Sequence, residues 1–191
     1  MRQEQAPVWR IVLAETHNCL RVEIAMKESL FFSPDEIMVG LVADDVETVL
    51  EAGAIALGAA AGMPSQGIYG RLRESEQLGS TATGAGFALP HAFMTTLHEP
   101  MKLLMVLREP VLFDPHNPLT AVDIVVMMIW PAFRQQGFLP SLARHSRIFA
   151  NNKLLERLRS ARNEADVITV LTGHNRGTPA MRSGVAKGLI S

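Results

Sequence analysis

Two long apolar segments limit most strongly what this chain can fold into. Residues 101–109 read MKLLMVLRE and residues 121–130 read AVDIVVMMIW, and a loop with three prolines separates them. Near-continuous runs of Val, Ile, Leu and Met are typical of strands that are buried on both faces. We therefore expect a central β-sheet that is covered by helices on both sides.

Four segments have the features of those helices. Helices are expected over residues 44–63, 64–79, 141–161 and 163–173. In the first segment apolar residues recur at spacings of three and four, and either Asp44 or Asp45 can cap its N-terminus. Pro64 starts the second segment and Gly79 ends it, while Gly173 ends the last. The predicted fold class is α/β, with a mixed central β-sheet flanked by helices on both faces.

The length of 191 residues suits one domain with a full hydrophobic core. We expect an N-terminal extension over residues 1–25, a domain over residues 26–173 and a C-terminal tail over residues 174–191. Ser33 followed by Pro34, with two acidic residues next, is a helix-start signal near the beginning of that domain.

Composition excludes several classes of protein. The formal net charge of −1 argues against generic nucleic-acid binding, which requires a basic surface. Cys19 is the only cysteine, so an intramolecular disulfide is impossible. No secretory signal is recognisable, and the charge-free apolar runs are far shorter than the roughly 20 residues of a membrane helix. We expect a cytoplasmic protein without membrane insertion.

The segment GSTATGAGFALPH (79–91) is the most unusual part of the sequence. Its glycines do not fit a dinucleotide fingerprint, because Leu89 stands where a third small residue belongs, and no P-loop motif exists. The glycine-rich run can form either a loop of tight turns or a nest of N–H groups that binds an anion. His91 and His98 are seven residues apart without a metal-binding motif, so no metal or other cofactor is expected.

His91 stands out within this segment. Pro90 has a fixed φ and favours an extended Leu89, which restricts the backbone that carries the imidazole. A histidine at the end of a strand is usually structural or simply exposed. However, imidazole can act as a nucleophile at neutral pH without special activation.

The segment RESEQLGSTATGAGFALPHA resembles the active-site segment of enzyme IIA domains of the sugar phosphotransferase system, of the mannitol/fructose type. This type includes the nitrogen-regulatory IIA proteins. The family pattern is matched at nine positions: Leu78, Gly79, Ser80, Thr81, Gly84, Gly86, Ala88, Pro90 and His91. Resemblance continues over residues 26–172, including the loop and strand PVLFDPHNPLTAVDIVVMMIWPA.

The resemblance implies an α/β sandwich that carries a phosphoryl group. His91 would accept the group from an HPr-like phosphocarrier protein. It would then pass the group to a IIB domain, or hold it as a regulatory mark on a target in sugar uptake or nitrogen control. Ser80, Thr81, Thr83 and the N–H groups of glycines such as Gly84 would surround the phosphoryl oxygens. Such a protein is a phosphocarrier rather than a free-standing enzyme.

The sequence departs from the family pattern around this histidine. Ser75 stands where the family has an arginine, and Phe138 stands where it has a second histidine. Arg71 lies one turn before Ser75 on the same helix face, so it is our candidate phosphate ligand, although a solvated helix face explains it equally well. His145 is about 11 Å farther along the last long helix than Phe138, so it cannot replace the missing histidine.

Two hypotheses for function follow. In the first, the chain is a working phosphocarrier whose altered site uses Arg71. In the second, it is a IIA-like regulatory or binding domain that acts by protein contacts without being phosphorylated. The sequence does not distinguish a sugar, a downstream partner or an oligomeric state.

Overall fold

The computed structural model describes residues 32–176, which all belong to one compact unit. Along the chain the strands and helices run as follows: η1 (Pro34–Glu36), β1 (Ile37–Leu41), α2 (Val46–Ala61), α3 (Ser65–Leu78), β2 (Phe87–Ala88), β3 (His91–Met94), β4 (Met101–Leu112), η2 (Pro118–Thr120), β5 (Ala121–Pro131), α4 (Phe138–Phe149), α5 (Asn152–Arg159) and α6 (Glu164–Arg176). The expected extension over residues 1–25 and most of the expected tail lie outside the described residues.

The sheet has five strands and mixed directions. Its order is β1-β4-β5-β2, and β3 pairs with the same side of β5 as β2 does. β4 and β5 are antiparallel, whereas β1 is parallel to β4, and both β2 and β3 are parallel to β5. The two apolar segments of the sequence thus form the central pair of strands, as predicted.

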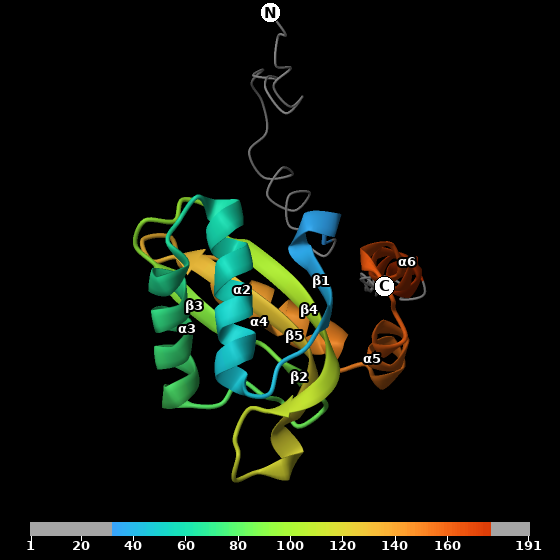
Figure 1. Cartoon of the computed structure of the whole chain (residues 1–191). Coiled ribbons are helices and arrows are strands. Elements are labelled where there is room, and N and C mark those ends of the chain that lie inside the picture. The colour runs from blue at the N-terminus through green and yellow to red at the C-terminus, as the bar shows by residue number, and fades with distance from the viewer. Residues whose placement is uncertain (1–31, 177–191) are drawn as a thin grey trace, which may run out of the picture. The chain divides into compact units, whose positions relative to one another are not determined.

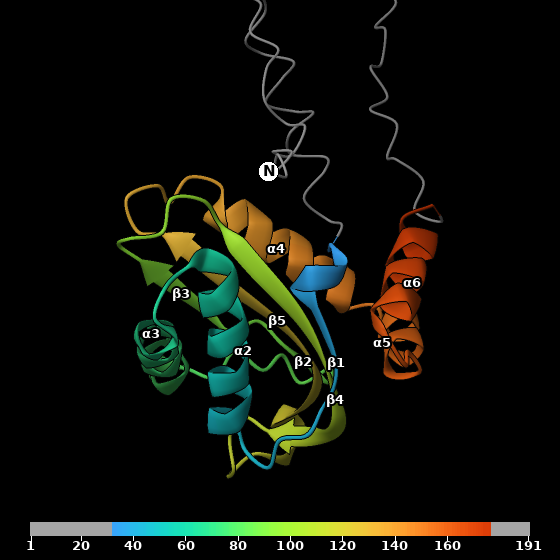
Figure 2. The ribbon, with the colours of Figure 1, turned by 45° about the horizontal axis from the view of Figure 1, so that its top comes forward.

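Helices cover both faces of this sheet (Figures 1 and 2). One core lies between the sheet and the pair α2 and α3, where Leu50 and Ile68 pack on Met105 and Met127. The other core lies between the opposite face and the helices α4, α5 and α6. The three-layer α/β architecture confirms the expected fold class.

Local signals in the sequence account for several element boundaries. Asp45 caps α2, because its side chain accepts a hydrogen bond of 2.8 Å from the Thr48 N–H. Ser33 and Glu36 form a capping box, but the helix they start is only the three residues of η1 before β1 begins. None of the helices within residues 32–176 has both the length and the apolar character that a membrane span requires.

The structure differs from the predicted helices at two places. The expected helix over residues 141–161 is interrupted at Ala150, because the Asn151 side chain accepts a hydrogen bond from the Leu154 N–H and starts a new helix. Gly173 does not end the last helix, and α6 continues to Arg176.

Candidate functional site

β2 and β3 are two parts of one strand along the edge of β5. Phe87 pairs with Ile124 and His91 pairs with Met128, so the register is unchanged across the interruption. The interruption coincides with Pro90, which has no N–H to donate. Its carbonyl still accepts a hydrogen bond of 2.9 Å from the Met128 N–H. His91 therefore begins β3 on a backbone that the neighbouring strand fixes.

The alternation of a strand decides which face of the sheet the imidazole joins. Ala92 and Met94 belong to the core under α2 and α3. Side chains alternate between the faces of a strand, so His91 and Phe93 lie on the opposite face. Both rings contact Phe138, the first residue of α4, with ring centroids 5.1 Å and 4.8 Å away respectively.

One hydrogen bond sets the tautomer of the imidazole. Nδ1 of His91 lies 3.0 Å from the carbonyl oxygen of Leu89. A carbonyl oxygen only accepts, so Nδ1 carries the proton in this bond and Nε2 keeps its lone pair. Pro90 favours an extended backbone at Leu89, the residue whose carbonyl accepts this hydrogen bond. In the singly protonated imidazole, Nε2 is therefore the nitrogen that has a lone pair available.

Phe138 gives the surroundings of the imidazole an aromatic character. Its side chain is 6% exposed, and besides His91 and Phe93 it contacts Trp130, with ring centroids 5.7 Å apart. This is the position where the family pattern has a second histidine. The imidazole contacts the Leu89 carbonyl on one side and the Phe138 ring on another.

The glycine-rich segment before β2 folds back on the strand as a tight hairpin. Ala82 forms an antiparallel bridge with Ala88, and the Thr83 N–H and hydroxyl both donate to the Phe87 carbonyl. The Leu89 N–H donates to the Thr81 carbonyl at 3.3 Å. Continuing this antiparallel pairing by two residues places Ser80 opposite Pro90, the residue before His91.

This hairpin separates the residues that the sequence predicted as phosphate ligands. Ser80 and Thr81 lie at the end nearest His91. Thr83 is hydrogen-bonded to Phe87. Phe87 is four residues before His91, so this end of the hairpin is about 13 Å from His91 along the strand. Gly84 is next to Thr83 at the tip, with a φ of 76°. The tip is thus held by its own internal bonds, at the far end from the imidazole.

Glu76 holds the end of the hairpin that lies near His91. One of its carboxylate oxygens accepts a hydrogen bond of 2.8 Å from the Thr81 N–H, and the other accepts one of 2.6 Å from the Thr81 hydroxyl. The sequence analysis did not single out Glu76. Glu76 lies near the end of a predicted helix and five residues before Thr81, and this position could have indicated a contact with the following segment.

The backbone of β5 and an ion pair between Asp123 and Arg159 lie against the hairpin at Gly86. The Asp123 and Ile124 N–H groups both donate to the Gly86 carbonyl. Asp123 also forms a two-pronged ion pair with Arg159 of α5, with N–O distances of 2.6 Å and 2.9 Å. The guanidinium occupies the space that a Cβ of Gly86 would need. Because these residues are 36 apart in the chain, sequence reasoning had no signal for the pair.

Arg71 lies on α3, which packs on the face of the sheet opposite the imidazole. Its Nη1 atom is 3.0 Å from a carboxylate oxygen of Glu74, and the Arg71 side chain is 60% exposed. An exposed ion pair of this kind is worth only about 0–1 kcal/mol, so Arg71 can change partner at small cost. Its role as a phosphate ligand stays a prediction.

His145 belongs to a different environment from His91. It is 1% exposed, its Nδ1 atom lies 2.8 Å from the Ser141 carbonyl, and its ring contacts Phe32 edge-on. Burial lowers the pKa of His145, and the positive charges of Lys102 and Arg144 lower it further, against the hydrogen bond to Ser141, which raises it. Its position fits the expectation that it does not replace the missing second histidine.

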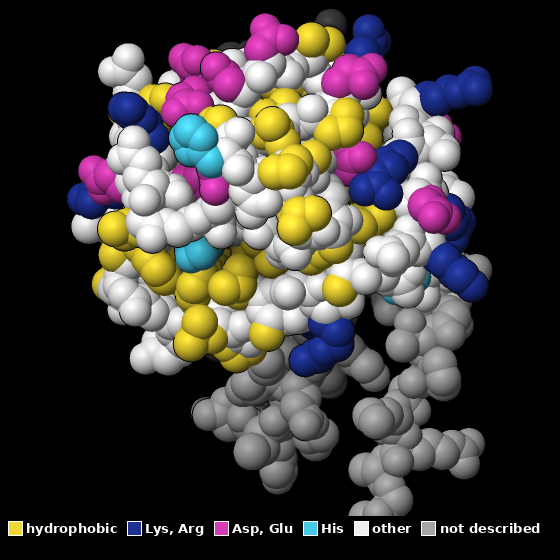
Figure 3. All heavy atoms as spheres, turned by 90° about the horizontal axis from the view of Figure 1, so that it is seen from below, with side chains coloured by type: hydrophobic (Ala, Val, Ile, Leu, Met, Phe, Trp, Pro, Cys, Tyr) yellow, Lys and Arg dark blue, Asp and Glu magenta, His cyan; other side chains and the backbone are white. Residues whose placement is uncertain are grey.

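Exposed apolar side chains flank the histidine site. Leu78, next to Gly79, is 92% exposed, and Leu139, next to Phe138, is 70% exposed. Figure 3 shows apolar side chains gathered over part of the face seen from below. Such apolar surface on a folded domain is typical of a contact area for another protein.

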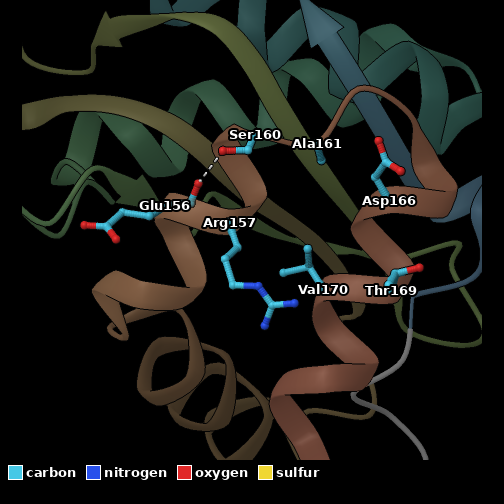
Figure 4. A pocket seen from close by; sticks show the side chains of 7 residues that line it. All are labelled: Glu156, Arg157, Ser160, Ala161, Asp166, Thr169 and Val170. Atoms are coloured by element: carbon cyan, nitrogen blue, oxygen red, sulfur yellow. Dashed lines mark hydrogen bonds between the residues drawn. The ribbon is translucent and has the colours of Figure 1, made fainter.

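The groove between α5 and α6 offers no comparable chemistry (Figure 4). Arg157 and Val170 line it from the two helices, and the Ser160 hydroxyl is bonded to the Glu156 carbonyl. Within residues 32–176 no group of three His, Cys, Asp or Glu side chains is placed to hold a metal ion. His91 beside the hairpin is therefore the centre of the candidate functional site.

The family model "Phosphoenolpyruvate-dependent sugar phosphotransferase system, EIIA 2" matches residues 30–173. The chain belongs to this family. Among curated relatives, a nitrogen regulatory protein of Bradyrhizobium diazoefficiens is 26% identical over 73% of this chain and 90% of its own length. A nitrogen regulatory protein of Escherichia coli is 27% identical over 61% of this chain and 71% of its own length.

Solved structures of the family share this fold. Nitrogen regulatory protein IIA-Ntr from Neisseria meningitidis superposes with a TM-score of 0.67 at 21% identity, covering 73% of this chain and 94% of its own. IIA mannitol from Escherichia coli gives a TM-score of 0.64 at 15% identity, over 73% of this chain and 98% of its own. The IIA-type architecture predicted from the sequence motif is thereby confirmed.

Proposed function

We propose that this IIA domain accepts a phosphoryl group on Nε2 of His91. In this step the Nε2 lone pair forms a bond to phosphorus while the bond between phosphorus and the donor breaks. The hydrogen bond from Nδ1 to the Leu89 carbonyl carries the proposal, because it orients the ring and favours the neutral tautomer whose lone pair is on Nε2. Transfer of this kind needs placement and charge stabilisation more than elaborate covalent chemistry.

Groups at the near end of the hairpin support the same role. The Ser80 hydroxyl accepts a hydrogen bond from the Ala82 N–H, and its own proton is available for a phosphoryl oxygen. α4 begins at Phe138, so the positive end of its helix dipole lies on the side of the imidazole. Thr81, Thr83, Gly84 and Arg71 complete the set of candidate phosphate ligands. However, both donors of Thr81 are bonded to Glu76, Thr83 and Gly84 lie farther away, and Arg71 lies on a helix of the opposite face.

The donor we propose is an HPr-like phosphocarrier protein, and the acceptor is a IIB domain or a regulated target protein. One solved relative is a complex of IIA mannitol with phosphorylated IIB mannitol from Escherichia coli, and it covers 74% of this chain with a TM-score of 0.61. The exposed Leu78 and Leu139 flank the site and suit contacts with such partners. The relatives named as nitrogen regulatory proteins favour a regulatory target.

The second candidate function is that of a IIA-like binding domain that is not phosphorylated. Phe138 favours it, because the ring contacts the imidazole where the family pattern has a histidine. An aromatic face is electronegative, so it does not stabilise the negative charge of a phosphoryl group as a cation does.

Incubation with phosphoenolpyruvate, enzyme I and HPr distinguishes the two functions. The phosphocarrier gains the mass of one phosphoryl group, labile in acid and stable in base, and His91→Ala abolishes the gain while His98→Ala keeps it. Arg71→Ala should slow the reaction more than Arg73→Ala if Arg71 contacts the phosphoryl group. A wild-type protein that remains unmodified with its cognate HPr contradicts the proposal and favours the binding domain.

A further inference from the structure

Glu76 joins the end of α3 to the glycine-rich hairpin through both of its carboxylate oxygens. Oε1 accepts from the Thr81 N–H at 2.8 Å and Oε2 accepts from the Thr81 hydroxyl at 2.6 Å. Hydrogen bonds to a charged acceptor at these lengths are among the stronger ones in proteins. Two bonds from one carboxylate to two donors of one residue fix the orientation of Thr81 as well as its position.

The backbone of Leu89 connects Thr81 to the histidine. The Thr81 carbonyl accepts a hydrogen bond from the Leu89 N–H at 3.3 Å. The carbonyl of the same Leu89 accepts the hydrogen bond from Nδ1 of His91 at 3.0 Å. Glu76 is therefore connected to the imidazole by three successive sets of hydrogen bonds.

We propose that Glu76 is a positioning residue for the His91 site. Gly79 and Gly84 give the hairpin backbone a freedom that side chains would restrict, so an external tie is needed to hold it in one place. Glu76 supplies this tie at the near end, and it keeps Leu89 and Ser80 where the imidazole and an incoming phosphoryl group require them. This inference rests on the proposed phosphoryl transfer to His91.

The negative charge of Glu76 suggests that it slows phosphorylation instead of supporting it. One substitution separates this charge effect from the positioning role. A carboxylate near the site could slow phosphorylation by repelling the phosphoryl group. A glutamine at this position keeps both bonds without the charge, because its carbonyl accepts from the Thr81 N–H and its NH₂ donates to the Thr81 hydroxyl. An alanine removes both bonds and the charge together.

The experiment compares the wild type with Glu76→Gln, Glu76→Ala and the control Glu51→Ala, which removes an exposed carboxylate from α2. The rate of phosphoryl transfer is measured against the concentration of phosphorylated HPr. Positioning predicts that Glu76→Ala lowers kcat about tenfold or more with little change in KM, since it disturbs placement rather than binding. Glu76→Gln and Glu51→Ala should both stay near the wild type.

Other outcomes overturn the proposal. Equal kcat in Glu76→Ala and the wild type means that the tie does not serve the reaction. Faster transfer in both Glu76 variants means that the carboxylate acts by repulsion. If Glu76→Ala fails to fold, Thr81→Val takes its place, because it removes the hydroxyl bond and keeps the N–H bond, and it should lower kcat by a smaller factor.

A second measurement remains valid if the wild type takes up no phosphoryl group, which would refute the proposed function itself. Hydrogen exchange at the Thr81 amide and the ¹⁵N shifts of the His91 ring are recorded for the same variants. If Glu76 positions the hairpin, Glu76→Ala should show faster exchange of the Thr81 amide and an altered balance of imidazole tautomers. Glu76→Gln should show the exchange rate and the tautomer balance of the wild type. Unchanged exchange and unchanged ring shifts refute the positioning role whatever the result for phosphorylation.

Discussion

Replacing His145 should reduce the dependence of the protein's stability on acid. The imidazole is 1% exposed and, among the described residues, its Nε2 atom has no hydrogen-bond partner. Burial lowers the pKa of His145, and the nearby Lys102 and Arg144 lower it further despite the hydrogen bond to the Ser141 carbonyl. The native protein therefore holds this side chain neutral at pH values where the unfolded chain protonates it.

The sign and size of the effect follow from proton linkage. The free pKa of histidine is about 6.5, so below this pH the unfolded chain binds a proton that the folded protein does not. The free energy of unfolding then falls by up to about 1.4 kcal/mol for each pH unit until the native imidazole is itself protonated. Between pH 6.5 and 5 this slope allows a loss of at most about 2 kcal/mol from this residue, and above pH 6.5 the loss fades.

Urea unfolding between pH 5 and 8 measures this loss in the wild type and in His145→Leu. The variant's stability at neutral pH can change in either direction, because leucine removes a polar atom and also changes the packing on Phe32. The test is the slope of stability against pH, which should be shallower in His145→Leu and unchanged in His116→Gln, an exposed control. Equal slopes in His145→Leu and the wild type would refute the assignment of this acid dependence to His145.

Two further substitutions test the hairpin and the aromatic contact. Gly86→Ala should lower the free energy of unfolding by about 2–3 kcal/mol and Gly84→Ala by about 1–2, because both backbones have a positive φ but only the former places a Cβ against Arg159. Chemical denaturation measures both, and the excess at Gly86 should disappear in an Arg159→Ala background. Phe138→His should prolong the lifetime of a phosphoryl group on His91, because a histidine can donate a hydrogen bond to it; mass spectrometry over time follows the decay, and an unchanged lifetime excludes this role.

The parts of the fold that the sequence predicted have strong local signals. β4 and β5 were predicted because their apolar residues continue without alternation. Of the two predicted caps of α2, Asp44 and Asp45, the structure selects Asp45. β2 and β3 lacked such a signal, since each is short and is defined by its pairing with β5. The break between α4 and α5 depends on a single asparagine, which competes with an otherwise continuous helical pattern.

The candidate site likewise has some features with a local sequence signal and others without one. The sequence predicted either tight turns or a nest in the glycine-rich segment and a restricted backbone at His91, because glycines release the backbone and Pro90 restricts it locally. The hairpin itself has no such local signal. The role of Leu89 as acceptor for Nδ1 required the three-dimensional structure, as did the pairing of Asp123 with Arg159. The distance of Thr83 from the imidazole also followed only from the register of the hairpin, because residues close in sequence are separated when the chain folds back.

The charges around His91 decide how a phosphoryl group on it would be stabilised. Arg71 is paired with Glu74 and Arg159 with Asp123. Lys102 lies on the same face as His91 with Met128 between them, about 10 Å away by strand spacing, and its ammonium lies over the Phe32 ring.

Among the described groups, the Ser80 hydroxyl, backbone N–H groups and the start of α4 are placed to stabilise a phosphoryl group on His91, and Arg71 would have to leave Glu74 to join them. A cation of the partner protein would add to this stabilisation. The lifetime of phosphorylated His91 should therefore lengthen when the partner is bound and shorten when it dissociates.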